Sequence, residues 1–250
     1  MITLKSAREI DLMRRSGQIA AEALRLGGSE VRPGVTTKHI NDVMHKYIKS
    51  KNATPSFLGY GGFPAAACIS VNNEVIHGIP SGRLIADGDI VSIDVGVLLN
   101  GYHSDTAATF PAGNVSPKAM ELIEVTRQCF YEGLAQVYEG NRLGDIGYSV
   151  SQYAHRHGFS VVEEYVGHGV GTQLHEDPSV PNYGVRGKGQ RLMQGLTIAI
   201  EPMINQGGLE VAQIDRNGWT VVTKDGSLSA HYEHTVAVTS NEPLILTSLS

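Results

Sequence analysis

Apolar residues recur along the first part of the chain every three or four positions, which is the spacing of one face of a helix. The run follows Ser6-Ala-Arg-Glu9, a capping box that predicts a helix N-terminus, and continues to Leu24 before Gly27-Gly28. A second helix of the same kind begins at Thr36 or Thr37. Each helix is expected to bury one stripe against a common core and to end at its glycines or polar residues.

Later in the chain, similar patterns predict two more helices and several strands. Ser116-Pro117 combines an N-cap with a first-turn proline and begins a helix that continues toward Val137. Another helix is predicted at about 145–157. The predicted strands are 68–71, 160–166, 196–200 and a final hairpin in which 219–223 pairs with 231–238.

The element that the pattern predicts most strongly is a pair of apolar strands joined by Asn100-Gly101. Asn-Gly favours a type I′ turn, because both central residues of that turn need positive φ. The turn places Gly96 opposite Asp105 and Asp94 opposite Ala107, so the two acids share one face, roughly 7–8 Å apart. Two carboxylates on a buried face repel each other, which predicts a cation between them; a solvated hairpin face is the alternative.

The hairpin has a counterpart in the second half of the chain. Gly88 to Asp94 and Gly195 to Glu201 share one spacing of glycine, apolar residues and acid, and each is followed by a second carboxylate, Asp105 or Glu233. This similarity predicts two pseudo-symmetric halves, about 1–111 and 112–250, within one catalytic domain of residues 1–250. It would bring four acids into one cleft; chance similarity of two strands is the alternative.

These four acids, together with His168, form a candidate metal centre. The basic residues near these strands are too few to pair with all four acids, because Lys and Arg concentrate on the predicted helices and loops. Four carboxylates and an imidazole suit two divalent ions of Mn, Fe, Co or Zn. Two ions about 3.5–4 Å apart can share a hydroxide whose pKa is close to neutral, which is a chemistry suited to hydrolysis.

The composition excludes several other classes of protein. The chain has 250 residues and a net charge of −5, so nothing in its composition suggests a basic surface for nucleic-acid binding. No apolar stretch approaches the length of a membrane span, and the N-terminus has no signal core. Cys68 and Cys129 are far apart in the sequence and lack CxxC spacing, so a reducing cytoplasm is the expected location.

Five short motifs carry the candidate ligands: Ile93-Asp94-Val-Gly, Gly101-Tyr-His-Ser-Asp105, Gly167-His168-Gly-Val-Gly, Ile200-Glu201-Pro202 and Tyr232-Glu233-His-Thr. With them the chain resembles, over essentially its whole length, the type I methionine aminopeptidases of peptidase family M24. The resemblance implies an α+β fold, the pita-bread (creatinase/aminopeptidase) fold: a pseudo-two-fold antiparallel sheet covered by helices in a single domain.

The resemblance also implies a role for each ligand of a dinuclear centre. Asp105 and Glu233 would bridge both ions, Asp94 would chelate one, and His168 with Glu201 would hold the other. A hydroxide that bridges the ions would attack the scissile carbonyl, with Glu201 as the proton shuttle.

Two further histidines and an apolar pocket acquire roles in the same way. By resemblance, His175 stabilises the oxyanion and His77 contacts the substrate backbone; a developing negative charge does require a fixed donor in a site that contains little water. The other residues that the resemblance assigns to the substrate pocket are Tyr60, Cys68, Leu174 and Trp219, with Phe57 and Phe63 at its margin.

The implied activity is removal of the initiator methionine from nascent proteins and peptides that have a small second residue. The expected enzyme is a cytoplasmic monomer whose partners are nascent N-termini, with transient ribosome contact left open and no nucleic-acid or membrane binding. Two alternatives remain: an Xaa-Pro aminopeptidase or prolidase, which generally carries a large N-terminal domain, and a binding protein that has lost its metals. Type II enzymes carry an insertion where this chain has only residues 202–232 between its last two candidate glutamates.

Overall fold

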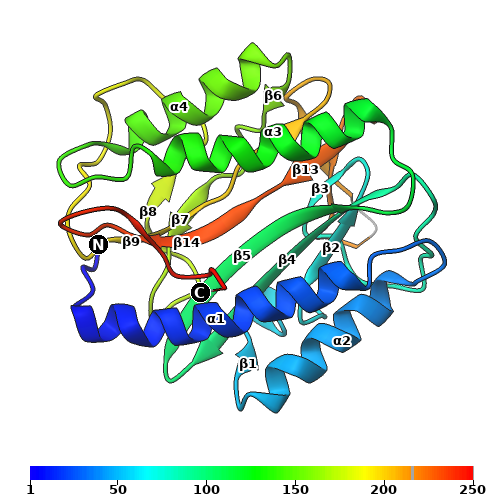
Figure 1. Ribbon diagram of the computed structural model, residues 1–250, viewed down its shortest axis with the longest axis horizontal. Coiled ribbons are helices and arrows are strands. Elements are labelled where there is room, and N and C mark those ends of the chain that lie inside the picture. The colour runs from blue at the N-terminus through cyan, green and yellow to red at the C-terminus, as the bar shows by residue number, and fades with distance from the viewer. Residues whose placement is uncertain (215–216, 250) are drawn as a thin grey trace.

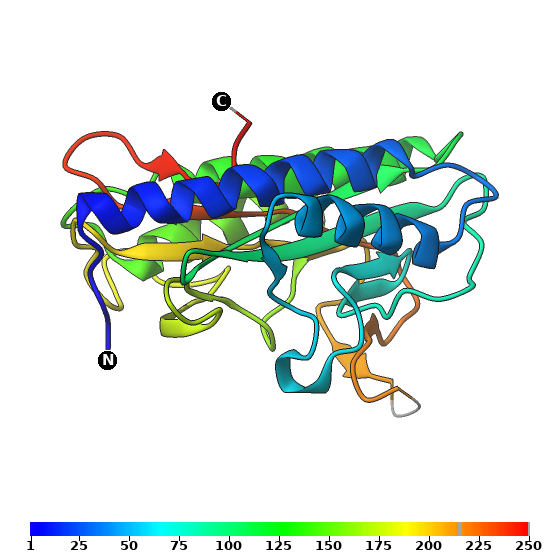
Figure 2. The same ribbon diagram turned by 90° about the horizontal axis from the view of Figure 1, so that it is seen from below.

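A large antiparallel sheet forms the middle of the molecule, with helices along one face and loops and short strands on the other (Figures 1 and 2). The computed structural model describes residues 1–214 and 217–249, and every element below belongs to these residues. The helices of this described part are α1 (Ala7–Ser29), α2 (Thr37–Ser50), the short 3₁₀ helix η1 (Tyr60–Gly62), α3 (Pro117–Leu134) and α4 (Leu143–Arg156).

The central sheet has the strand order β1-β4-β5-β14-β9-β7-β8, with β2 also paired to β4 and β15 to β14. Its strands are β1 (Thr54–Pro55), β2 (Cys68–Val71), β4 (Ile90–Leu99), β5 (Tyr102–Pro111), β7 (Gly167–Gly169), β8 (Glu176–Val180), β9 (Thr197–Ile200), β14 (Glu233–Ala237) and β15 (Leu244–Ile245). Strands β4 and β5 therefore meet the second half of the chain where β5 pairs with β14.

Two small sheets lie beside the central one. The first has the order β13-β10-β6 and the second β11-β12-β3. Their strands are β3 (Glu74–Ile76), β6 (Ser160–Val161), β10 (Met203–Asn205), β11 (Val211–Gln213), β12 (Val221–Thr223) and β13 (Ser229–His231).

The capping box predicted at the start of α1 is confirmed. The Ser6 hydroxyl accepts from the Glu9 N–H, and the Glu9 carboxylate accepts from the Ser6 N–H. Gly27-Gly28, however, lie inside α1, which ends at Ser29. Their missing side chains allow close packing: a Cβ on Gly27 would lie 2.5 Å from the Met44 sulfur, and one on Gly28 would lie 2.3 Å from the Phe110 ring.

The later helices begin close to the predicted positions. Ser116 caps α3 through the Ala119 N–H, and Pro117 occupies the first helical turn. This helix ends at Leu134, before the predicted Val137, and α4 begins at Leu143, two residues earlier than predicted. Such differences are typical of helix ends.

The predicted hairpin register is confirmed. Asp94 lies opposite Ala107 and Gly96 lies opposite Asp105. Asn100 and Gly101 have φ values of 52° and 83°, as the two central positions of a type I′ turn require.

The predicted final hairpin is wrong. β12 pairs with β11 and β3, while the expected partner segment forms β13, which pairs with β10, and β14, which pairs with β5 and β9. Burial explains the result, because Val221 on β12 packs with Val75 and Val211 in an apolar cluster away from the central sheet. The predicted strand 160–166 is also shorter than expected: only Ser160–Val161 pairs, and Glu163 and Glu164 are exposed.

Two apolar clusters hold the helices on the sheet. α1 and α2 supply Leu24, Ile40 and Met44 to a cluster with Ile93 and other residues of β2 and β4. α3 and α4 pack through a second cluster on β9 and β14. The division into halves at residue 111 stays a prediction. Within residues 1–214 and 217–249, none of the helices combines the length and hydrophobicity that crossing a bilayer requires.

Candidate active site

Four acids, Asp94, Asp105, Glu201 and Glu233, form an acidic row on the face of the central sheet that the helices do not cover. Ile93 and Val95 belong to the cluster under α1 and α2, so Asp94 between them points to the opposite face. Across the strands, Cys68 pairs with Asp94, Asp94 with Ala107, and Ala107 with Glu233. The backbone ladder thus aligns acids from distant parts of the chain.

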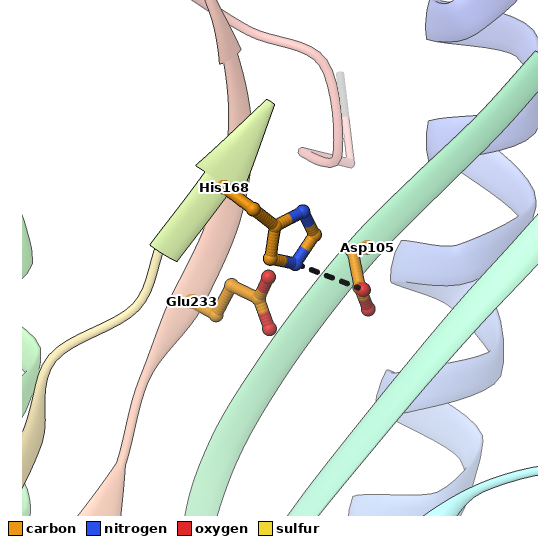
Figure 3. Close-up of side chains that lie close together, drawn as sticks. All are labelled: Asp105, His168 and Glu233. Carbon is orange, nitrogen blue, oxygen red and sulfur yellow. Dashed lines mark ion pairs between the residues drawn. The ribbon is translucent and has the colours of Figure 1, made fainter. Parts of the chain in front are cut away.

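His168 on β7 faces this row. Its Nε2 lies 3.9 Å from Asp105 Oδ2 and 3.5 Å from Glu201 Oε1. Figure 3 shows the His168, Asp105 and Glu233 side chains pointing toward one another from β7, β5 and β14. The His168 Nδ1–H donates to the Gly169 carbonyl at 2.9 Å, which leaves the Nε2 lone pair directed toward the acids.

The glycines on either side of His168 allow β7 to lie close to its neighbours. A Cβ on Gly167 would lie 2.3 Å from the Ala199 carbonyl oxygen, and one on Gly169 would lie 2.3 Å from the Asp177 carbonyl oxygen. A side chain at either position would therefore push the strand that carries His168 away from its neighbours.

Burial dominates the electrostatics of the centre. It raises the pKa of Asp105 to about 7, and it raises the pKa values of Asp94, Glu201 and Glu233 well above their usual range, with neighbouring acids adding repulsion. Burial also lowers the pKa of His168 to about 3, so this imidazole is neutral and its Nε2 lone pair is free to bind a cation. These groups need a cation in order to be charged together.

The donor set fits such a cation. Asp94 Oδ1, Asp105 Oδ1 and Glu233 Oε1 are buried and have no hydrogen-bond partner. Two groups among the described residues place their donor atoms within 4.8 Å of one another: Asp105, His168 and Glu233, and Glu201, His231 and Glu233. Oxygen and imidazole donors without a thiolate match divalent ions of the Mn, Fe, Co and Zn group.

A cavity of about 280 Å³ opens over the acidic row. Its walls include the predicted pocket residues Phe57, Tyr60, Phe63, Cys68, Leu174 and Trp219. Phe63 and Trp219 meet edge to face with their centroids 5.2 Å apart, as part of a small apolar cluster at this end of the cavity. The arrangement places an apolar compartment beside a polar centre.

His175 and His77 lie on the cavity wall. His175 Nδ1 lies 2.7 Å from the Tyr60 hydroxyl, and its ring centroid lies 4.1 Å from that of His168. His77 has a φ of 59°, an uncommon value for a residue with a side chain. Backbone strain of this kind concentrates at functional sites, because the surrounding structure must hold it. Burial lowers the pKa of His77 to about 4.

The structure brings every sequence-predicted site residue to this one cavity. Sequence reasoning missed other wall residues, namely Ile76, Tyr165, Val166, Gly167 and Ser179. It also missed His231, which is 2% exposed and lies beside Glu201 and Glu233. A signal existed, since His231 precedes Glu233 by two residues and alternate residues of an extended chain share a face.

A buried carboxylate–imidazole centre on such a sheet is typical of metal-dependent hydrolases. The profile of metallopeptidase family M24 matches residues 11–240, and the chain belongs to this family. It is 54% identical to the methionine aminopeptidase of Clostridium perfringens and 47% identical to methionine aminopeptidase 1 of Bacillus subtilis, each over 99% of both chains. The resemblance predicted from the motifs is thus confirmed.

Comparison with solved structures supports the same family and fold. The methionine aminopeptidase of Rickettsia prowazekii superposes with a TM-score of 0.98 at 43% identity, covering 99% of this chain and 100% of that one. The prolidase of Pyrococcus furiosus gives a TM-score of 0.79 at 23% identity, and this chain covers 66% of it. The prolidase shares the fold alone, so the fold class is confirmed and the prolidase-like alternative is not favoured.

Proposed function

We propose that this protein is an aminopeptidase that uses divalent metal and removes the N-terminal methionine from peptides and nascent proteins with a small second residue. The observation that carries the proposal is the acidic row opening into an apolar cavity closed by aromatic side chains. The identity to relatives named methionine aminopeptidase supports it.

Asp94, Asp105, His168, Glu201 and Glu233 would hold two divalent ions, with Co, Mn, Fe and Zn as the candidates. Bound there, the ions would supply Lewis-acid polarisation of the scissile carbonyl and lower the pKa of water to near neutrality.

The protein side chains would then manage protons and charge. Glu201 lines the cavity, so its carboxylate would accept a proton from the attacking water and deliver it to the leaving amine. The Tyr60 hydroxyl can donate to His175 Nδ1, which leaves His175 Nε2–H as a donor for the developing oxyanion. His77, held in its strained conformation, would orient the substrate backbone.

The apolar end of the cavity would select the first side chain. Methionine is unbranched and makes favourable contacts between its sulfur and aromatic rings. Phe63, Cys68, Leu174 and Trp219, in the cluster with Phe57, supply such a surface, and Tyr60 stands at its exposed edge.

The type I assignment rests on the short segment 202–232, which forms β10 to β13 and supplies Trp219 to the cavity. We propose that the enzyme is a cytoplasmic monomer acting at nascent N-termini, with transient ribosome contact left open. Both cysteines are free and buried, in keeping with that location.

The test is methionine release by chelated protein that is reloaded separately with Co(II), Mn(II), Fe(II) or Zn(II). We expect cleavage of Met-Ala-Ser and little cleavage of Xaa-Pro peptides. Glu201→Ala should lose about 10²–10⁴-fold in rate, whereas Glu210→Ala, at an exposed glutamate outside the cavity, should keep wild-type activity. Preference for Xaa-Pro peptides, or near wild-type release by Glu201→Ala, would contradict the proposal.

A further inference from the structure

His231 is a fully buried imidazole that lies behind two of the candidate metal ligands. Its Nε2 is 3.8 Å from Glu201 Oε2 and 3.9 Å from Glu233 Oε2. The ring is not among the residues that line the cavity, although both glutamates are. Its Nε2 has no hydrogen-bond partner, so a polar atom directed at two carboxylates has nothing else to satisfy it.

The backbone of His231 is fixed from both sides. The Thr109 hydroxyl accepts from the His231 N–H and donates to the His231 carbonyl, each at 2.9 Å. The Ser92 hydroxyl lies 2.8 Å from that of Thr109 and completes the chain of hydrogen bonds. Strand pairing between β13 and β10 places His231 opposite Met203, two residues after Glu201. The backbone that carries the ring is therefore held in place independently of any ion.

The two oxygens of Glu201 face different imidazoles. Oε1 lies 3.5 Å from His168 Nε2, on the cavity side, and Oε2 is the oxygen nearest to His231. A carboxylate that binds an ion through one oxygen commonly accepts a hydrogen bond on the other from a second layer of residues. His231 lies where the residue that donates this hydrogen bond to Glu201 would be.

We propose that His231 is a positioning residue of the metal centre: its Nε2–H donates from behind to the carboxylate of Glu201 or of Glu233 and directs the other oxygen of that acid into the cavity. Both separations exceed a hydrogen bond, so the proposal requires one glutamate to rotate toward Nε2 when the metal binds. The inference rests on the proposed function, because it requires these acids to bind metal.

Two substitutions separate a donor role from simple packing. His231→Leu removes the donor at similar volume, whereas His231→Gln keeps an N–H. His103→Gln is a matched control, because His103 precedes Asp105 by two residues and its Nδ1 already lies 2.8 Å from the Ser56 hydroxyl. Each chelated protein is titrated with Co(II) by calorimetry and followed by visible absorption.

Of the two Co(II) ions expected, the Leu variant should bind the one with higher affinity about 10–100-fold more weakly than the wild type does, and its absorption spectrum should change. The Gln variant should recover most of the affinity, and the His103 control should match the wild type. Equal affinity of the Leu variant and the wild type, or equal loss in the Leu and Gln variants, would overturn the role of His231. A wild type that binds no Co(II) would instead contradict the proposed function.

A measurement on the wild type covers the case in which the Leu variant does not fold. Histidine labelled with ¹⁵N reports which ring nitrogen carries the proton, and the His231 signal is assigned by its loss in His231→Gln. With Zn(II) bound, we expect His231 to keep its proton on Nε2. A proton on Nδ1, with Nε2 binding the ion, would make His231 a ligand and overturn the positioning role.

Discussion

Lys5 is a buried cation that ties the start of the chain to the loop carrying His175. Its side chain is 3% exposed and pairs with Glu176, whose side chain is 12% exposed. The Lys5 Nζ also donates to the Thr3 carbonyl, and the Lys5 N–H donates to the Gly195 carbonyl. Because Glu176 follows His175 directly, this ion pair helps to set the position of the proposed oxyanion donor.

Removing only one partner of this pair should be costly. Lys5→Met leaves Glu176 buried without its cation, and we expect a loss of about 3 kcal/mol in the free energy of unfolding. The double variant Lys5→Met/Glu176→Gln should recover most of that loss. Urea denaturation measures both, and equal stability of the single and double variants would contradict the prediction.

The same pair predicts a pH dependence. Burial alone would raise the pKa of Glu176, but hydrogen bonds from Lys5 and Gln173 outweigh it and hold this pKa below its usual value of 4.5. A pKa lowered by folding stabilises the protein above the unfolded-state value, and the contribution disappears as pH falls through the folded-state value. Unfolding at pH 7 and at pH 3 should therefore show a larger acid-induced loss for the wild type than for Lys5→Met/Glu176→Gln.

At the scale of residues, the sequence predicted the acids because each lies on or beside an apolar strand. It missed His231, because a lone histidine is more often a core residue and only the fold places Glu201 beside it. Tyr165 was missed for a similar reason: no local pattern distinguishes it, and tertiary packing alone sets its ring 6.0 Å from that of His77.

At the scale of elements, local chemistry predicted the Asn100-Gly101 hairpin and the N-termini of α1 and α3. The final hairpin failed because its strands find remote partners: Glu233 on β14 pairs with Ala107 on β5, across more than half of the chain. Lys224-Asp-Gly226 does form a turn after β12, since the Gly226 N–H donates to the Thr223 carbonyl. Burial nevertheless decides which partners the strands on either side of this turn find.

The contact between α1 and the C-terminal segment depends on a missing side chain. A Cβ on Gly17 would lie 2.1 Å from the Leu246 carbonyl oxygen, a backbone atom that cannot move freely. Gly17→Ala should therefore lower the free energy of unfolding by about 1–3 kcal/mol.

Gly82→Ala is the matched control for this prediction, because a Cβ at Gly82 meets nothing within 4 Å. It should leave stability unchanged or slightly increased. Thermal unfolding compares the two variants, and equal melting temperatures would show that α1 tolerates the extra atom.

At the scale of the whole molecule, the motifs and the resemblance predicted the fold class, whereas periodicity alone could not have given the strand order. The sheet joins β4 and β5 to β14 and β9 through pairings that no local signal encodes. The two halves were predicted from a short similarity between Gly88–Asp94 and Gly195–Glu201, and that division remains a prediction.

Metal removal should lower the stability of the whole protein, because an ion that binds only the folded state stabilises it by mass action. At a free concentration of 100 times the dissociation constant, the gain is about 2.7 kcal/mol, or roughly 5–10 °C in melting temperature. Chelated protein should regain this difference with Co(II) or Mn(II) but not with K⁺. The Glu201→Ala variant should show a smaller gain, and an unchanged melting temperature in the wild type would contradict a metal centre.

The acidic row also has a consequence for which substitutions the centre can accept. Neighbouring strands lie about 4.8 Å apart, so hydrogen bonding between backbones, not side-chain packing, sets the positions from which Asp94 and Glu233 reach across Ala107. Exchanging Asp for Glu preserves charge but displaces the carboxylate by about 1.5 Å, a large part of a metal–oxygen bond of about 2.1 Å. Backbone pairing thus fixes the Cα position of each acid. The length of the side chain then decides whether its carboxylate reaches the centre, so we expect each position to accept only one of the two acids.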